Sequence, residues 1–120
     1  MNLPNADGVE VEKEKITGYL LNPLHPDAAG KAAFFTAMGF RDDAWEGLAN
    51  ALRQVAACCP VVREVDSPHG AKYVVDGAMP TPIGRTPSVR TIWIINQGED
   101  TPRLVTAYPH ERGAQDAEGT

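Results

Sequence analysis

The stretch that decides the fold is Pro60–Asp76, "PVVREVDSPHGAKYVVD". Two runs rich in β-branched and aromatic residues flank the turn signal "SPHG", and the proline at the start ends any preceding helix. A connection this short favours antiparallel neighbours. The stretch therefore predicts two adjacent antiparallel strands, Val61–Asp66 and Lys72–Asp76.

Two more strand candidates follow, Val89–Asn96 and Arg103–Tyr108, the second with "RLVTAYP" as its sequence. The break before the first is the loop Met79–Pro87, which contains three prolines and one glycine and carries Arg85. Loops of this length are often functional. Together the four runs predict a four-stranded antiparallel meander.

The N-terminal half is typical of helices. A short helix is expected within "VEVEKEKITGYLL", and "NPLHP" ends it. The next helix is expected to have Pro26 in its first turn and to stop at Gly39, and a third to be capped by Asp42 or Asp43. We therefore expect an α+β fold in which two to three N-terminal helices pack on one face of the C-terminal sheet. We also expect residues 1–109 to form a single domain and residues 110–120 to form a flexible acidic tail.

Composition limits the classes of function. The 120 residues are 42% apolar and 22% charged, and a formal charge of −5 argues against gripping nucleic acid by bulk electrostatics. From Val61 to Pro109, however, five cations balance five carboxylates, so the charge does not exclude a locally basic groove in this part of the chain. No apolar run is long enough for a membrane span, and the start of the chain lacks the pattern of a signal peptide. We expect a cytoplasmic protein without a membrane partner.

The cysteine and histidine patterns give no sign of a cofactor. Cys58 and Cys59 are adjacent, so free thiols are expected. His25, His69 and His110 show no metal-ligand spacing. We therefore expect neither a metal nor another cofactor.

What remains is a scatter of cations and hydroxyls over the predicted sheet. A metal-free ribonuclease needs a group that takes a proton from a 2′-hydroxyl, positive charge for the phosphate, and a proton for the leaving oxygen. Each candidate also has a structural interpretation. Most surface cations are simply solvated, Lys31 can snorkel from an apolar helix face, and threonines suit strands without any further role. Strand alternation puts Leu104, Thr106 and Tyr108 on one side, which is neither cleanly apolar nor cleanly polar.

Several blocks resemble an uncharacterised bacterial family, a domain of unknown function found as small stand-alone proteins and as C-terminal toxin modules. The blocks are "LPNAD", "EKITGYLLNPLHP", "GKAAFF", "DDAWEGLANAL", "HGAKYVVDG", "GRTPSVRTIWII" and "PRLVTAYP". The resemblance runs from about Leu3 to Pro109. The order of helices and strands is similar to that of the barnase–EndoU–colicin–RelE superfamily of ribonuclease toxins.

That similarity implies metal-independent cleavage of RNA and a cognate antitoxin or immunity protein as partner. Carried over by position, it implies six site residues, namely Lys31, Lys72, Arg85, Thr91, Thr106 and Tyr108. One departure concerns the helix lysine. The family commonly has a histidine directly before it and an arginine two residues after it, where this chain has Gly30 and Ala33. The domain is thus expected to be a ribonuclease toxin, weakened or degenerate. The alternative is a non-catalytic interaction module, or a small cytoplasmic protein of unrelated function on the same fold.

Overall fold

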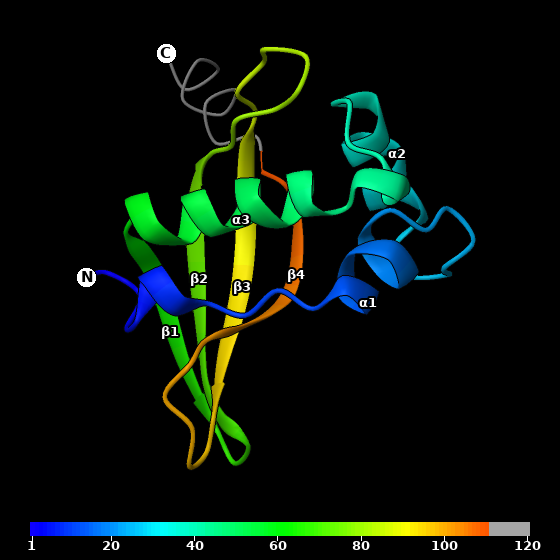
Figure 1. Ribbon diagram of the computed structural model, residues 1–120. Helices are drawn as coiled ribbons and strands as arrows, with labels where there is room; N and C mark the ends of the chain where they lie inside the picture. Colours follow the sequence, from blue (N-terminus) through cyan, green and yellow to red (C-terminus); the bar gives the residue numbers. More distant parts are fainter. Residues whose placement is uncertain (111–120) are drawn as a thin grey trace.

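The computed structural model describes residues 1–110. Its helical elements are η1 (Ala6–Gly8), α1 (Lys13–Lys15), the π-helical turn η2 (Ile16–Leu20), α2 (Ala29–Ala37), η3 (Asp42–Ala44) and α3 (Glu46–Cys58). Its strands are β1 (Val61–Ser67), β2 (Gly70–Ala78), β3 (Ser88–Asn96) and β4 (Arg103–Pro109). Helices precede strands along the chain, so the predicted α+β class is confirmed (Figure 1). The predicted tail lies outside the described residues, except for His110.

The four strands form one antiparallel sheet in the order β1-β2-β3-β4. This is the meander that the short connections predict, and each strand begins or ends within two residues of its expected bounds. β4 has a second neighbour on its outer edge, because the N-terminal segment pairs with its start. The Glu10 amide donates to the Pro102 carbonyl at 2.8 Å, and the Leu104 amide donates to the Glu10 carbonyl at 3.0 Å.

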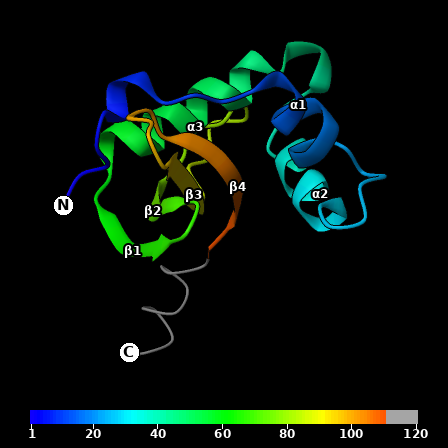
Figure 2. The same ribbon diagram turned by 90° about the horizontal axis from the view of Figure 1, so that it is seen from below.

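The core lies between α3 and one face of the sheet. α3 presents buried leucines, valine and alanines to Val75, Val89 and Trp93, which are all fully buried. The short helices α1 and α2 lie to one side, beyond the β4 edge, as Figures 1 and 2 show. No helix within residues 1–110 is long and apolar enough to cross a bilayer.

The strand register decides which side chains share the other face of the sheet, which we call the outer face. Val75, Thr91 and Ala107 lie opposite one another and point to the core. Because side chains alternate along a strand, their neighbours point to the outer face. One row of that face joins Asp76, Arg90 and Tyr108, and the next places Ile92 opposite Thr106.

Helix ends differ in part from expectation. Gly39 has a φ of 97°, so the predicted left-handed stop after α2 is present. α2 itself begins only at Ala29, because residues 26–28 form turns rather than helix. The start of α3 has no side-chain cap, since Asp43 pairs with Arg41 at 3.1 Å instead.

Candidate functional site

Three polar side chains meet where the helices contact β4. Lys31 on α2 extends its ammonium to the Tyr19 hydroxyl on η2 at 2.6 Å and to the Thr106 hydroxyl on β4 at 3.0 Å. The two hydroxyls are themselves 3.0 Å apart. Each member of this polar triangle therefore contacts the other two. All three side chains are half-buried, so solvent and small ligands reach them.

The triangle makes Tyr19 more acidic. Partial burial opposes ionisation of the phenol, but hydrogen bonds with Lys31 and Thr106 and the positive charges of Lys31 and Lys15 outweigh it. The pKa of Tyr19 is lowered from its ordinary value of 10.0. Since a lowered pKa makes the phenolate more available near neutral pH, Tyr19 is suited to accept a proton.

Aromatic rings and one histidine hold the triangle in place. Lys31 Nζ lies 5.0 Å from the centroid of the Tyr19 ring and 5.6 Å from that of the Tyr108 ring. His25 packs edge-on against Tyr19, with ring centroids 4.9 Å apart. Its Nδ1 accepts a hydrogen bond from the Asp27 amide at 3.1 Å, so His25 fixes the turn before α2.

An open depression of about 370 Å³ adjoins Tyr19. Its lining combines Glu12, Glu14, Lys15, Tyr19 and His25. The depression is therefore of mixed charge, and it gives a ligand access to one side of the Tyr19 ring.

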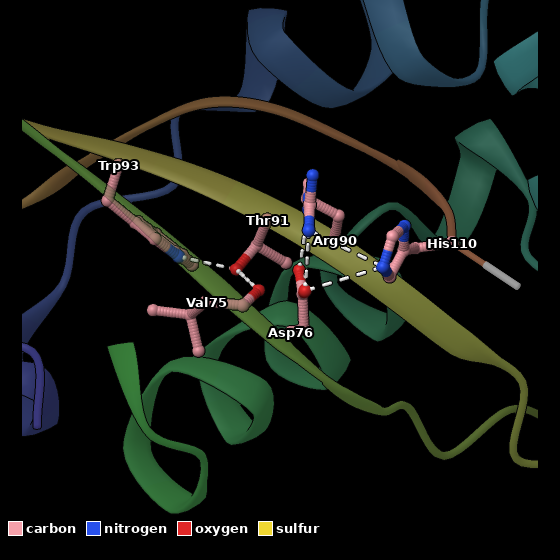
Figure 3. A network of polar contacts seen from close by, with 6 residues as sticks. All are labelled: Val75, Asp76, Arg90, Thr91, Trp93 and His110. Atoms are coloured by element: carbon pink, nitrogen blue, oxygen red, sulfur yellow. Dashed lines mark hydrogen bonds and ion pairs between the residues drawn. The ribbon is translucent and has the colours of Figure 1, made fainter. Parts of the chain in front are cut away.

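A second polar network lies farther along the same face (Figure 3). The Asp76 carboxylate is almost fully buried and accepts two hydrogen bonds from Arg90, from Nε and from Nη2, both at 2.8 Å. His110 Nε2 lies 3.6 Å from Asp76 Oδ2 and 3.4 Å from Arg90 Nη2. The two-pronged bond to Asp76, and next the charge of that carboxylate and the nearby Tyr108 phenol, raise the pKa of Arg90 above its ordinary value against the effect of burial. Arg90 is thus permanently charged and held in one orientation.

The structure brings together three of the six predicted site residues. Lys31, Thr106 and Tyr108 share the β4 end of the outer face. Lys72 is exposed on the same face but lies on β2, opposite Ile94 rather than next to β4. Arg85 is exposed in the loop between β2 and β3.

Thr91 lies on the core side of the sheet, apart from these residues. It is fully buried, donates to the Val75 carbonyl at 2.8 Å and accepts the Trp93 Nε1–H at 2.8 Å (Figure 3). Both of its hydrogen-bonding functions are used within the core, so its hydroxyl satisfies a buried indole.

Several residues of the site were not among the six predicted site residues, namely Tyr19, His25, Asp76, Arg90 and His110. The sequence held a signal for Asp76 and Arg90, because pairing of the two predicted neighbouring strands would put "VVD" beside "SVR". Nothing in the sequence placed Tyr19 or His110. Among residues 1–110, no group of three histidines, cysteines or carboxylates is arranged to hold a metal ion.

The fold and this site define a small α+β domain with a cationic, hydroxyl-rich site on an open sheet face. The chain belongs to the family described as domain of unknown function DUF6883, whose model matches residues 2–111. The expected membership of an uncharacterised family is confirmed, while kinship with the barnase–EndoU–colicin–RelE superfamily stays a prediction. No curated protein matches the sequence.

A solved structure shares the fold. It is a chain of the contact-dependent growth inhibition toxin–immunity protein complex from Klebsiella pneumoniae 342. The TM-score is 0.68 at 16% sequence identity, and the match covers 87% of this chain and 95% of that chain. At this level of identity the likeness concerns the arrangement of helices and strands.

Proposed function

We propose that this protein is a toxin-type, metal-independent endoribonuclease of the barnase–EndoU–colicin–RelE kind, acting on RNA in the cytoplasm. The observation that carries the proposal is the polar triangle of Lys31, Tyr19 and Thr106. It combines an ammonium group, a phenol with a lowered pKa and a hydroxyl within hydrogen-bond distance of one another. These are the groups that RNA cleavage without a metal requires.

The triangle supports a complete proton cycle. Ionised Tyr19 accepts the proton of the 2′-hydroxyl, and the 2′-oxygen then bonds to phosphorus. The bond from phosphorus to the 5′-oxygen breaks, and the leaving oxygen takes a proton from the Lys31 ammonium. Because Tyr19 and Lys31 are hydrogen-bonded at 2.6 Å, the proton on Tyr19 passes back to Lys31 and restores both groups. The products are a 2′,3′-cyclic phosphate and a 5′-hydroxyl.

The remaining predicted residues have supporting roles in this proposal. Thr106 holds the Tyr19–Lys31 pair, and Tyr108 offers a ring on which a base can stack beside Lys31. Lys72 and Arg85 lie away from the triangle, so they bind RNA phosphates at a distance from the bond that breaks. Thr91 supports the sheet from the core side.

The fold likeness to a chain of a toxin–immunity complex supports a toxin-like role and a cognate partner protein. We propose that such a partner covers the outer face at β4. In that position it would block access of RNA to the triangle.

The test is cleavage of total RNA by the purified protein, with and without a chelator. We expect products ending in 2′,3′-cyclic phosphate, unaffected by the chelator. Lys31→Ala should lower the rate by roughly 10²–10⁴-fold, the usual contribution of proton-transfer catalysis. Lys13→Ala, which removes an exposed lysine from α1, is the matched control and should cleave normally. Absence of cleavage by the natural sequence would refute the proposal.

A second candidate function is a non-catalytic interaction module. The observation in its favour is the edge of β1 beyond Val61, whose amide donates to the Met1 carbonyl; along that edge Val62 and Val65 are 45% and 39% exposed. Exposed valines on a sheet edge suit a partner protein better than a nucleic acid. Expression of the protein alone in a bacterial host discriminates the two functions. A nuclease toxin stops growth unless a companion protein is supplied, and Lys31→Ala relieves the arrest, whereas an interaction module leaves growth unchanged.

A further inference from the structure

We propose that Arg90, oriented by Asp76, is a second phosphate-binding group, so that the outer face holds two successive phosphates of an RNA strand on either side of Tyr108. This inference rests on the proposed function for the identity of the ligand. The Asp76–Arg90–His110 network takes no part in the proton cycle described above.

Arg90 has the geometry of a prepared anion-binding side chain. Two of its five N–H donors are bonded to Asp76. The Asp76 side chain is only 3% exposed, whereas the Arg90 side chain is 31% exposed. The carboxylate therefore fixes a guanidinium that stays partly exposed, with His110 Nε2 3.4 Å from Nη2 and the Tyr108 phenol as its other polar neighbours. A planar guanidinium held in this way matches two phosphate oxygens.

His110 lies against both members of the pair. Its side chain is 24% exposed, and its Nε2 lies 3.6 Å from Asp76 Oδ2 and 3.4 Å from Arg90 Nη2. The imidazole therefore helps to hold the Arg90 guanidinium in place.

Tyr108 links the two cations. It lies opposite Arg90 in the strand register, and its phenol contributes to the raised pKa of that arginine. Its ring centroid is also 5.6 Å from Lys31 Nζ. One aromatic ring flanked by two cations fits a nucleotide whose base stacks on the ring and whose two phosphates meet Lys31 and Arg90.

The experiment compares the affinities of two single-stranded deoxyoligonucleotides that cannot be cleaved, a dinucleotide with one phosphate and a trinucleotide with two. We expect the natural sequence to bind the trinucleotide at least tenfold more tightly. Arg90→Gln should abolish this difference while keeping dinucleotide affinity. It should also lower the slope of log affinity against log salt by about 0.7 for the trinucleotide. Arg53→Gln, which removes the same charge from α3 on the far side of the sheet, should change neither value.

Arg90→Gln leaves the buried Asp76 carboxylate unpaired, so that variant is destabilised. Arg90→Lys keeps the ion pair but replaces the planar guanidinium by a point charge. This variant should retain the fold and still show at least half of the loss of trinucleotide affinity that is expected for Arg90→Gln. Asp76→Asn combined with Arg90→Gln offers a neutral hydrogen-bonding pair and should behave as Arg90→Gln does. Equal trinucleotide affinity in all three variants and the natural sequence would overturn the inference.

Other outcomes separate the inference from the proposed function. RNA cleavage with an unchanged affinity ratio in Arg90→Gln overturns only the second phosphate site. Arg90-dependent binding of the trinucleotide without RNA cleavage upholds that site and refutes the nuclease. If the protein neither binds oligonucleotides nor cleaves RNA, both are refuted.

Discussion

The ammonium of Lys31 on α2 lies 3.0 Å from the hydroxyl of Thr106 on β4, although 75 residues separate them in the chain. This contact joins the helical half of the protein to the edge of the sheet, and Tyr19 completes it from a third element. The most distinctive chemistry of the molecule is therefore produced by tertiary docking rather than by any local motif.

The first prediction concerns the titration of Tyr19. Among the three tyrosines, Tyr19 has a lowered pKa, whereas burial, and next the charges of Glu64 and Asp66, raise the pKa of Tyr73. Absorbance of phenolate should therefore show Tyr19 ionising below pH 10.0, and Lys31→Met should move that transition upward. A Lys31→Met titration that superimposes on that of the natural sequence would contradict the triangle.

The lowered pKa of Tyr19 also determines the direction in which stability and activity change with pH. Between the native pKa of Tyr19 and 10.0, the unfolded chain binds more protons than the native protein. The contribution of Tyr19 to the free energy of unfolding therefore grows as the pH rises through this window, and it is lost as the pH falls below the native pKa. The cleavage rate should rise through the same window, and Tyr19→Phe should remove the rise.

A matched pair of substitutions separates structural from functional threonines. Thr91→Val deprives the buried Trp93 Nε1–H of its acceptor and should cost about 1–3 kcal/mol in the free energy of unfolding. Thr106→Val removes a half-buried hydroxyl, so its cost should be about 1 kcal/mol or less, yet it should lower RNA cleavage. Denaturant unfolding measures the two stability costs. Cleavage rates should be compared at a temperature below the unfolding midpoint of Thr91→Val, where both variants are folded. The reverse ranking of the two variants would show that these roles are misassigned.

The close approach of β2 to the end of α3 makes Gly77 hard to replace. A Cβ at this position would overlap the Cys59 sulfur and lie 3.1 Å from the Cys59 Cβ. Gly77→Ala should therefore cost about 1–3 kcal/mol in the free energy of unfolding. Cys59→Ala should recover part of that loss in the double variant, because the two sites share one contact. Additive effects of the two substitutions would argue against this packing.

The departure at Gly30 that the resemblance implies is directly testable. Gly30 is exposed on α2 next to Lys31, and a Cβ built there meets nothing within 4 Å. Gly30→His should therefore fold, and if the family histidine transfers protons it should raise the cleavage rate at least tenfold. Gly30→Ala is the control and should change only stability, by about 0.5–1 kcal/mol in favour of the native state. Equal rates for both variants would show that this place has no role in proton transfer.

Much of the sheet could be predicted because its signals are local. Runs of valine and isoleucine separated by glycine and proline mark strands, and short connections imply antiparallel pairing. The helical half was less predictable. Ile16–Leu20 forms a π-helical turn, and no sequence pattern distinguishes such a turn from an ordinary helix end.

The site residues likewise divide into those that the sequence could predict and those that it could not. Lys31, Thr106 and Tyr108 were predicted from a resemblance, and the structure puts them together. Tyr19 looked like one more apolar residue of a short helix, and its role depends on how that helix docks. The pairing of Asp76 with Arg90 depends on the register between β2 and β3, for which the sequence offers only the neighbouring runs "VVD" and "SVR" as a signal.

Every strand of the sheet pairs with its neighbour in the chain, so the contacts that build the sheet are local in sequence. The polar triangle instead closes contacts across 75 and 87 residues. Its reactive geometry therefore forms only after the helical half has docked on β4. The arrangement that lowers the pKa of Tyr19 is lost as soon as the helical half leaves β4, so the chemistry of this protein is conditional on its complete native topology.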